Sequence, residues 1–415
     1  MLNLLYANFK GKIFDEPGYL MLGASGFNYV LPNQKEIIKL PRYSKFFFIL
    51  DSPALGINKK TKKAELLDTY HYTVSVFLPA GYLRTLLPSL AFKRSGKLLP
   101  LWAYAACGFK NNIVYACAIK LDSYEKWNPQ KYDDKELLIR AKILDKKFKV
   151  NSLYRQLFTC ATIYHCFTAK NFFMGFSELA VPLSSKCNAS CIGCISLQTD
   201  NNFPSSQNRI TKTPLLKDVL ELTSYHISKV KEPIVSFGQG CEGEPLLEVD
   251  TIKKILQSLK TLHKNTTFNI NTNGSLTKNL KPLIRAGLDT ARISINSAIK
   301  ERYALYFRPK GYDFDNVVSS IKVLKDSCVC VMLNLLVFPG ITDQEREIEP
   351  LIKLIQKTKP AMLQLRNLNI DPRLYLAIIK PKEKSLGIVD FLKIIRKVFP
   401  SLKIGSFNRP KSYFK

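Results

Sequence analysis

The sequence predicts an α/β protein in which a partial (β/α)6 barrel of the TIM type follows an N-terminal mixed α/β domain. Two observations support this fold class. Short apolar runs alternate with helical patterns after residue 176, and 46% of the 415 residues are hydrophobic, which is enough to fill a sizeable core. We expect three parts: an N-terminal domain of unknown role (1–175), the barrel (176–375), and a C-terminal extension of helix and strand (376–415).

Residues 1–175 have the pattern of a mixed α/β domain. Short apolar stretches such as "FFFIL" (46–50) and "YTVSVFLPA" (72–80) alternate there with Pro, Gly and Lys clusters, and no periodic repeat is evident. No motif in this region indicates a ligand. The region could form a lid or a recognition surface for the barrel.

Six short runs after residue 176 are the predicted strands of the barrel. They are β-branched or wholly apolar, which is typical of strands buried on both faces of a parallel sheet. They span residues 178–183, 233–237, 267–271, 291–295, 329–338 and 361–366. In such a barrel the functional residues lie at the C-terminal ends of the strands.

Helical patterns with identifiable ends separate these strands. Thr213 before Pro214 combines an N-cap residue with a proline in the first turn, and apolar residues then recur on one face. Further helices are predicted to begin at Asp250, Ser275, Asp313 and Thr342. Strands and helices that alternate in this way form a parallel sheet, and right-handed crossovers curl it into a full or partial barrel.

The segment "KCNASCIGCIS" (186–196) places Cys187, Cys191 and Cys194 in the loop after the first predicted strand. We find no export signal, and in a reducing compartment clustered thiols bind metal more often than they form disulfides. A structural zinc needs four protein ligands, and the nearest others, Cys166 and His226, are distant in sequence. A 4Fe-4S cluster held by three cysteines leaves one iron open to a substrate or cofactor. A structural zinc and unliganded thiols are the alternatives.

Polar and glycine-rich motifs follow the later strands. Strand two leads into "FGQGCEGEPLL" (237–247), strand three ends in "NTNGS" (271–275), and strand four reads "RISINS" (292–297). The segments "YFRPKGY" (306–312), "FPGITD" (338–343) and "QLRNLNIDP" (364–372) come after them. Glycines allow the backbone to approach a ligand closely, and carboxylates and amides accept hydrogen bonds from an amine. Alternatively, buried Asn, Ser and Gln side chains satisfy one another inside a barrel.

On these motifs, over roughly residues 178 to 372, the chain resembles the radical S-adenosylmethionine (SAM) superfamily. Its N-terminal region is similar to an extension of functionally unassigned members. The resemblance implies a 4Fe-4S cluster on Cys187, Cys191 and Cys194 whose open iron binds SAM. It also implies that SAM is held by Gly243, Glu244 and Pro245 at its ammonium group, and by Asn271, Thr272, Asn273, Ser294, Asn296, Arg308, Asn334, Gln364 and Arg366 elsewhere.

One position departs from the pattern of this superfamily. Many members have an aromatic residue just before the third cysteine, where it packs near adenine, and Gly193 holds that place here. We therefore expect another residue to close the adenine pocket.

The resemblance implies a radical SAM enzyme that cleaves SAM reductively and abstracts a hydrogen atom from an unknown substrate, with RNA and peptides as candidates. The protein would mostly position the reactants and exclude water. The alternatives are a non-catalytic iron-sulfur or zinc protein, serving electron transfer or structure, and a basic nucleic-acid-binding protein. Members that modify peptides often carry auxiliary clusters in a cysteine-rich C-terminal tail, whereas no cysteine follows Cys330 in this sequence.

Cys241 is a candidate catalytic residue, because it lies two residues before the Gly-Glu-Pro element. A thiol beside SAM could return a hydrogen atom to a substrate radical. In the alternative interpretation the glycine-rich turn needs only a small residue there, and cysteine is as suitable as serine or alanine.

The formal charge of +29 suggests an anionic partner. An external electron is needed, so we expect an acidic electron donor such as a flavodoxin or ferredoxin, and nucleic acid is an alternative partner. Lysines spread singly over solvated faces would explain the same charge without any partner. No apolar run approaches the length of a membrane span, and we expect a cytoplasmic protein.

Overall fold

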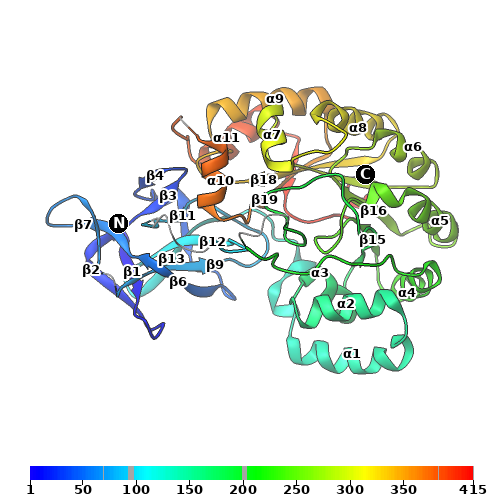
Figure 1. Cartoon of the computed structure of the whole chain (residues 1–415), viewed down its shortest axis with the longest axis horizontal. Coiled ribbons are helices and arrows are strands. Elements are labelled where there is room, and N and C mark those ends of the chain that lie inside the picture. The colour runs from blue at the N-terminus through cyan, green and yellow to red at the C-terminus, as the bar shows by residue number, and fades with distance from the viewer. Residues whose placement is uncertain (69, 92–97, 199–202, 382, 415) are drawn as a thin grey trace.

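The computed structural model describes residues 1–68, 70–91, 98–198, 203–381 and 383–414. A part made of antiparallel strands lies beside a barrel of parallel strands and helices, and three helices lie along the barrel between them in sequence (Figure 1). The predicted class, a partial α/β barrel after a mixed α/β N-terminal region, is confirmed. The division of the chain at residues 175 and 375 stays a prediction.

In the described ranges, the N-terminal part has one ten-stranded and one three-stranded antiparallel sheet. Leu5, Val74, Val76 and Ala105 form part of an apolar core on the larger sheet. That sheet contains β1 (Asn3–Ala7), β2 (Ile13–Met21), β5 (Ile37–Lys39), β6 (Lys45–Pro53), β7 (Leu55–Asn58), β8 (Ala64–Leu66), β9 (Tyr72–Phe77), β10 (Tyr82–Arg84), β12 (Tyr104–Lys110) and β13 (Ile113–Lys120). The smaller sheet contains β3 (Gly23–Ser25), β4 (Asn28–Val30) and β11 (Leu87–Pro88).

Three helices connect the antiparallel part to the barrel: α1 (Asp134–Phe148), α2 (Ser152–Thr162) and α3 (Phe167–Met174). Asp133 and Asn151 cap the first two, because their side chains accept hydrogen bonds from backbone N–H groups of the first turn. The buried rings of Phe148, Tyr154 and Phe172 pack between these helices. Helix α3 lies against the first barrel strand and covers the edge of the sheet there.

The barrel is a parallel sheet whose strands follow the order of the sequence. Counted over the described residues it has seven strands: β14 (Glu178–Val181), β15 (Ile234–Phe237), β16 (Thr267–Thr272), β17 (Thr290–Ile295), β18 (Cys330–Val337), β19 (Met362–Asn367) and β20 (Lys403–Gly405). The first six are the predicted strands. Strand β20 lies in the C-terminal extension, for which helix and strand were predicted, but its place in the barrel sheet was missed, because three residues carry too little pattern to indicate it.

Helices α4 to α11 cover the outside of this sheet (Figure 1). Asp313 caps α8 in a capping box, as predicted. The starts predicted at Thr213, Ser275 and Thr342 lie two to three residues before the first residues of α4, α6 and α9. The bounds are α4 (Leu216–Lys229), α5 (Val249–Lys260), α6 (Thr277–Arg285), α7 (Lys300–Phe307), α8 (Phe314–Asp326), α9 (Glu345–Thr358), α10 (Pro372–Ile379) and α11 (Ile388–Val398). None of the helices in the described ranges has the length and apolar character that crossing a membrane requires.

The segment after β20 closes the N-terminal end of the barrel. Asn408 Nδ2 donates a hydrogen bond to Glu178 Oε1, at the start of β14, over 2.7 Å. The backbone N–H of Lys411 donates to Thr267 Oγ1, at the start of β16, over 2.9 Å. This segment therefore covers the N-terminal end of the barrel. In barrels of this kind, the loops at the opposite, C-terminal end carry the functional residues.

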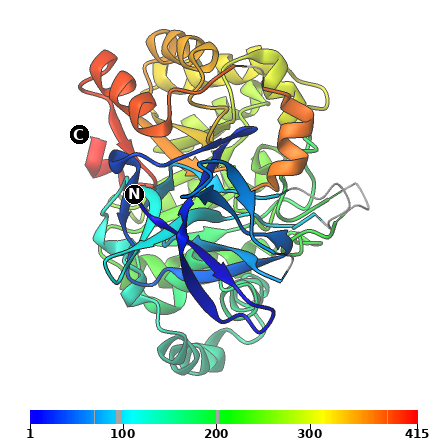
Figure 2. The ribbon, with the colours of Figure 1, turned by 90° about the vertical axis from the view of Figure 1, so that its left-hand side faces the viewer.

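The N-terminal sheets dock at that C-terminal end (Figure 2). Arg84 N–H donates to Asn367 Oδ1, the last residue of β19, over 3.0 Å, and Asn367 Nδ2 donates to the carbonyl of Tyr82 over 3.1 Å. In the loop after β18, a Cβ added to Gly340 would lie 1.8 Å from the backbone nitrogen of Gly26, so the two loops touch through their backbones. The N-terminal part thus forms one wall of the functional face.

Candidate functional site

The three cysteines of the predicted cluster site lie in the loop after β14, at the C-terminal end of the barrel. Cys187, Cys191 and Cys194 are all partly exposed and free. Burial raises the pKa of Cys187 to about 11, and the nearby Glu244 carboxylate adds to the rise. The pKa of Cys191 is raised well above its ordinary value by burial and then by Cys194 and Cys187. The three thiols therefore neighbour one another, and metal binding must release their protons.

Backbone hydrogen bonds attach this loop to the C-terminal end of α7. Ile192 N–H donates to the carbonyl of Tyr306 over 3.0 Å, and Ser190 N–H donates to the carbonyl of Arg308 over 3.2 Å. Arg308 ends α7 in a left-handed conformation and its side chain is exposed. The predicted role of Arg308 toward SAM stays a prediction, whereas its backbone holds the cysteine loop in place.

A guanidinium group lies beside the third cysteine. Arg209 Nη2 donates to Cys194 Sγ over 3.3 Å, and Arg209 Nε donates to Ser196 Oγ over 3.2 Å. A positive charge at this sulfur suits a negatively charged cluster. The sequence analysis missed Arg209, because the surrounding segment has no pattern that relates it to the cysteines.

No group of three His, Cys, Asp or Glu side chains in the described part of the chain is placed to hold a metal ion. A structural zinc needs four protein ligands, and the three cysteines supply three. In a cubane cluster each cysteine binds a different iron, so the thiols need not converge on a single metal ion. The partly exposed, neighbouring thiols of Cys187, Cys191 and Cys194 fit that requirement.

The Gly-Glu-Pro element packs directly on the cysteine loop. Gly243 N–H donates to the carbonyl of Ser184 over 2.6 Å, and Glu244 N–H donates to the carbonyl of Lys186 over 2.9 Å. A Cβ added to Gly243 would lie 1.8 Å from the oxygen of Lys186, so only glycine permits this approach. Pro245 begins the short 3-10 helix that follows. These residues hold the backbone in front of Cys187.

The carboxylate of Glu244 organises the end of β16. It is buried and accepts hydrogen bonds from Thr272 Oγ1, from Asn273 N–H (2.9 Å) and from Leu246 N–H (3.0 Å). Burial raises the pKa of Glu244 to about 7, and these hydrogen bonds oppose the rise. A cation such as an ammonium group would favour the ionised form.

Two asparagines connect the end of β16 to the cysteine loop and to the barrel. Asn273 Nδ2 donates to Oδ1 of Asn188, a residue of the cysteine loop that the sequence analysis missed, over 3.0 Å. Asn271 Nδ2 donates to the carbonyl of Gly238 over 2.9 Å, and its Oδ1 accepts from Asn269 over 3.0 Å. Both side chains therefore make structural contacts, and their predicted SAM contacts stay predictions.

Polar side chains of three neighbouring strands form a row in the barrel. Ser294, Asn334 and Gln364 lie in register on β17, β18 and β19. Asn334 Nδ2 donates to Ser294 Oγ over 3.0 Å, and Gln364 Nε2 donates to the carbonyl of Phe407 over 2.9 Å. Asn334 Oδ1 and Gln364 Oε1 are buried and have no hydrogen-bond partner. Buried acceptors without partners cost free energy, so they fit a ligand that supplies hydroxyl or amine donors.

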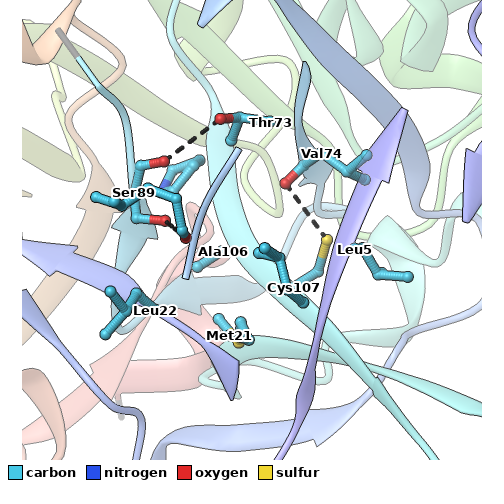
Figure 3. A pocket seen from close by; sticks show the side chains of 11 residues that line it. Leu5, Met21, Leu22, Thr73, Val74, Ser89, Ala106 and Cys107 are labelled. Carbon is cyan, nitrogen blue, oxygen red and sulfur yellow. Dashed lines mark hydrogen bonds between the residues drawn. The ribbon is translucent and has the colours of Figure 1, made fainter. Parts of the chain in front are cut away.

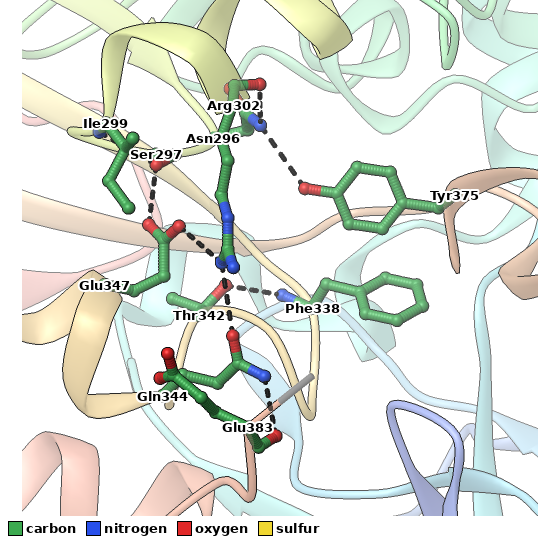
Figure 4. Close-up of polar contacts among 10 residues, drawn as sticks. All are labelled: Asn296, Ser297, Ile299, Arg302, Phe338, Thr342, Gln344, Glu347, Tyr375 and Glu383. Atoms are coloured by element: carbon green, nitrogen blue, oxygen red, sulfur yellow. Dashed lines mark hydrogen bonds and ion pairs between the residues drawn. The ribbon is translucent and has the colours of Figure 1, made fainter. Parts of the chain in front are cut away.

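Asn296 lies at one end of a buried polar network (Figure 4). Its Nδ2 donates to the carbonyl of Arg302 over 3.2 Å and to the hydroxyl of Tyr375 over 3.3 Å. Arg302 Nη1 pairs with Glu347 Oε1 at 2.7 Å and donates to Gln344 Oε1 over 3.2 Å. The two hydrogen bonds of Asn296 fix it between α7 and α10 and leave its buried Oδ1 without a partner, in keeping with a role in binding.

A tyrosine occupies the space beside Gly193, where the superfamily pattern has an aromatic side chain. A Cβ added to Gly193 would lie 2.9 Å from the hydroxyl oxygen of Tyr306. Tyr306 is buried at the end of α7, next to Phe307, and Cys191 and Cys194 contribute to raising its pKa. The aromatic ring at this position therefore comes from another element of the fold.

The thiol of Cys241 faces the N-terminal helices. It is buried and hydrogen-bonded to the thiol of Cys160 on α2, which together with burial raises its pKa well above the ordinary value. Its backbone carbonyl accepts a hydrogen bond from Ile210 N–H over 2.8 Å. These contacts support the interpretation of Cys241 as a small packed residue, and its hydrogen-atom role stays a prediction.

The segment that carries this site matches a known family. Residues 181–350 match the model of the Radical SAM superfamily, and the matched segment includes the three cysteines of the loop. The match begins at the end of β14 and ends in α9.

Two curated relatives share part of their sequence with this chain. "Molybdenum cofactor biosynthesis protein 1" of Dictyostelium discoideum is 24% identical over 227 residues, which cover 54% of this chain and 33% of the relative. A "Probable GTP 3',8-cyclase" of Methanocella arvoryzae is 27% identical over 191 residues, which cover 46% of this chain and 56% of the relative. The chain thus spans well under two thirds of the length of either relative.

A solved structure of a radical SAM methyltransferase from Sphaerobacter thermophilus is 11% identical to this chain. The superposed part covers 55% of this chain and 65% of the methyltransferase chain, with a TM-score of 0.40. A likeness of this degree carries no argument about activity.

Proposed function

We propose that the chain is a radical SAM enzyme, in which residues 181–350 form the radical SAM domain and Cys187, Cys191 and Cys194 hold the 4Fe-4S cluster. The observation that carries this proposal is the arrangement of the three neighbouring thiols in a loop fixed by α7 and by the Gly243 turn. When bound, the cluster and SAM supply a 5′-deoxyadenosyl radical that abstracts a hydrogen atom from the substrate.

The residues of the chain prepare the site in three ways. Arg209 places positive charge at Cys194, and Glu244 presents a buried carboxylate near Cys187, where the ammonium group of SAM would be neutralised. Asn296 and Asn334 offer unpartnered acceptors to the hydroxyl groups of the cofactor. The N-terminal sheets cover the loops after β18 and β19, which limits the access of water to a radical.

For the substrate, we propose a phosphorylated small molecule ahead of RNA or peptide. The support comes from the relatives, one of which is named a GTP 3',8-cyclase, and GTP is therefore the first compound to assay.

The decisive experiment is anaerobic reconstitution with iron and sulfide, followed by incubation with SAM and a strong reductant. We expect 5′-deoxyadenosine to form, and we expect GTP to stimulate its formation more than RNA or peptide pools do. Cluster binding without any 5′-deoxyadenosine would overturn the enzyme proposal and favour the alternative of an electron-transfer or structural protein.

The electron donor is proposed to be an acidic flavodoxin-like or ferredoxin-like protein, because the formal charge of the chain is +29. The cytoplasm, a reducing compartment that supplies such donors and keeps thiols free, is the proposed location. We predict that raising the ionic strength slows cluster reduction by a flavodoxin by roughly tenfold or more, since salt screens the attraction. Dithionite, a small reductant, serves as the control. If salt leaves the flavodoxin rate unchanged, the charge has another purpose.

A further inference from the structure

Two arginines of the barrel strands point into its interior. Arg292 lies on β17 and Arg366 on β19. Successive residues of a strand point to opposite faces, and the neighbours Ile293 and Leu365 belong to the apolar core between the sheet and the helices. The two guanidinium groups therefore lie on the other face, together with Asn334, Gln364 and the rest of the polar interior.

Within the described residues, neither arginine has a hydrogen-bond or ion-pair partner, and Arg292 Nε is a buried donor without an acceptor. Two buried arginines of the chain have carboxylate partners, although Arg409 Nε is, like Arg292 Nε, a buried donor without an acceptor. Arg302 pairs with Glu347 at 2.7 Å, and Arg409 pairs with Asp122 at 2.6 Å. In the described part of the chain, Arg302 and Arg409 thus have carboxylate partners, whereas the partly exposed Arg292 and Arg366 of the barrel have none.

The charges around these two arginines do not balance. Glu178 is the carboxylate that faces both, and its Oε1 already accepts a hydrogen bond from Asn408 over 2.7 Å. Asp122, whose negative charge favours the charged form of Arg366, is itself paired with Arg409. Burial and then Arg366 lower the pKa of Arg292 to about 9, whereas Glu178 opposes the change. Uncompensated positive charge in an interior costs free energy unless an anion neutralises it.

We propose that Arg292 and Arg366 bind an anionic group, a phosphate or a carboxylate, of the substrate of the radical SAM reaction proposed above. A guanidinium group donates two parallel hydrogen bonds to such an anion, and two of them can grip it from two sides. Gln364 Oε1, a buried acceptor without a partner on β19, then accepts a hydrogen bond from a substrate hydroxyl group. Arg292 precedes Ser294 by two residues on β17, so it lies deeper in the barrel than the C-terminal ends of the strands, where the cysteine loop is.

The direct test is the binding of pyrophosphate to the full-length chain, measured by calorimetry without SAM or reductant. We expect Arg292→Gln and Arg366→Gln each to weaken binding by at least roughly tenfold, because each removes charge-assisted hydrogen bonds. Arg285→Gln, on the exposed face of α6, is the matched control and should bind like the wild type. Equal affinity of all four proteins would overturn the proposal. The measurement does not depend on SAM cleavage, so a failure of the proposed activity would be seen separately.

A second measurement identifies which anion the arginines hold, because SAM also carries a carboxylate. We expect the affinity of the reconstituted protein for SAM to change less than threefold in either variant. If SAM binding falls tenfold while pyrophosphate binding is retained, the arginines hold the cofactor and the proposal is wrong.

Thermal unfolding separates binding from a merely structural role. Without ligand, removal of one of two unpartnered like charges should leave the melting temperature of Arg292→Gln unchanged or higher. Added pyrophosphate should raise the melting temperature of the wild type more than that of the variant. A variant that melts clearly lower than the wild type without ligand would show that the arginine supports the fold, against the proposal.

Discussion

The cysteines of the N-terminal sheet and those of the loop after β14 have different surroundings. In the N-terminal sheet, Cys107 and Cys117 are buried among apolar side chains, and burial raises the pKa of Cys107 to about 12. Cys107 lines a cavity of about 10 Å³, and its Sγ lies 3.8 Å from the carbonyl of Val74 (Figure 3). At the barrel, Cys191 and Cys194 are partly exposed, and a guanidinium group lies beside the latter.

The difference shows that the surroundings of a thiol, and not its presence, indicate chemistry. A buried thiol among apolar side chains behaves as a small hydrophobic residue and resists ionisation. Burial also raises the pKa of Cys187 and Cys191, but these thiols neighbour each other on one loop, so a bound metal can replace their protons. Four predictions test this comparison, in order of decreasing effect.

Replacement of Cys187, Cys191 and Cys194 together by alanine should abolish cluster binding. The reconstituted variant should contain almost no iron or sulfide and should lack the charge-transfer absorption of a cluster. Cys107→Ala is the control, and it should keep full iron content while losing about 1 kcal/mol of stability through a small cavity. A complete cluster in the triple variant would show that other residues hold it.

Gly243→Ala should be strongly destabilising, because the new Cβ would lie 1.8 Å from the oxygen of Lys186. We expect a loss of about 3 kcal/mol or more in the free energy of unfolding, measured with urea, and poor reconstitution of the cluster. The control is Gly175→Ala, where the left-handed backbone (φ +70°) disfavours a side chain but nothing lies within 4 Å of the added Cβ. It should lose only about 1 kcal/mol. Equal losses in the two variants would contradict the tight contact of the two loops.

The stability of the folded protein should fall as pH rises from 4.5 to about 7, because burial raises the pKa of Glu244 from its ordinary 4.5 to about 7. The folded state then binds more protons than the unfolded state, so this contribution is complete below 4.5 and is lost above 7. Glu244→Gln should remove on the order of 3 kcal/mol of this pH dependence. Unfolding curves at several pH values measure the slope, with the exposed Glu349→Gln as control. An unchanged slope in Glu244→Gln would contradict the assignment.

Cys241→Ala should have the smallest effect, because its thiol packs against Cys160 on α2. We expect an intact cluster, normal formation of 5′-deoxyadenosine and a loss of about 1 kcal/mol in stability. Product formation is the informative measurement once a substrate is known. Loss of product with retained SAM cleavage would support the hydrogen-atom role of this thiol and contradict its purely structural interpretation.

By itself, the sequence determined the class of fold and the candidate cluster site, because both depend on local patterns. Apolar runs alternate with capped helical segments over short distances, and Cys187, Cys191 and Cys194 lie within eight positions of one another. The glycine of the Gly-Glu-Pro element was also predictable, since close backbone approach requires glycine at Gly243. The charge at Arg292, inside an otherwise buried strand pattern, was a signal that could have been used.

Only the tertiary structure decided which residues complete the site, because these contacts join distant parts of the chain. Asn408 donates a hydrogen bond to Glu178, 230 positions away in the sequence. The ring of Tyr306 lies beside Gly193 although three strands separate the two residues along the chain. The thiols of Cys241 and Cys160 are likewise in contact although the residues lie far apart in the sequence. Such pairs leave no periodic trace in a single sequence, since they depend on how the strands close into a barrel and on where the N-terminal sheets dock.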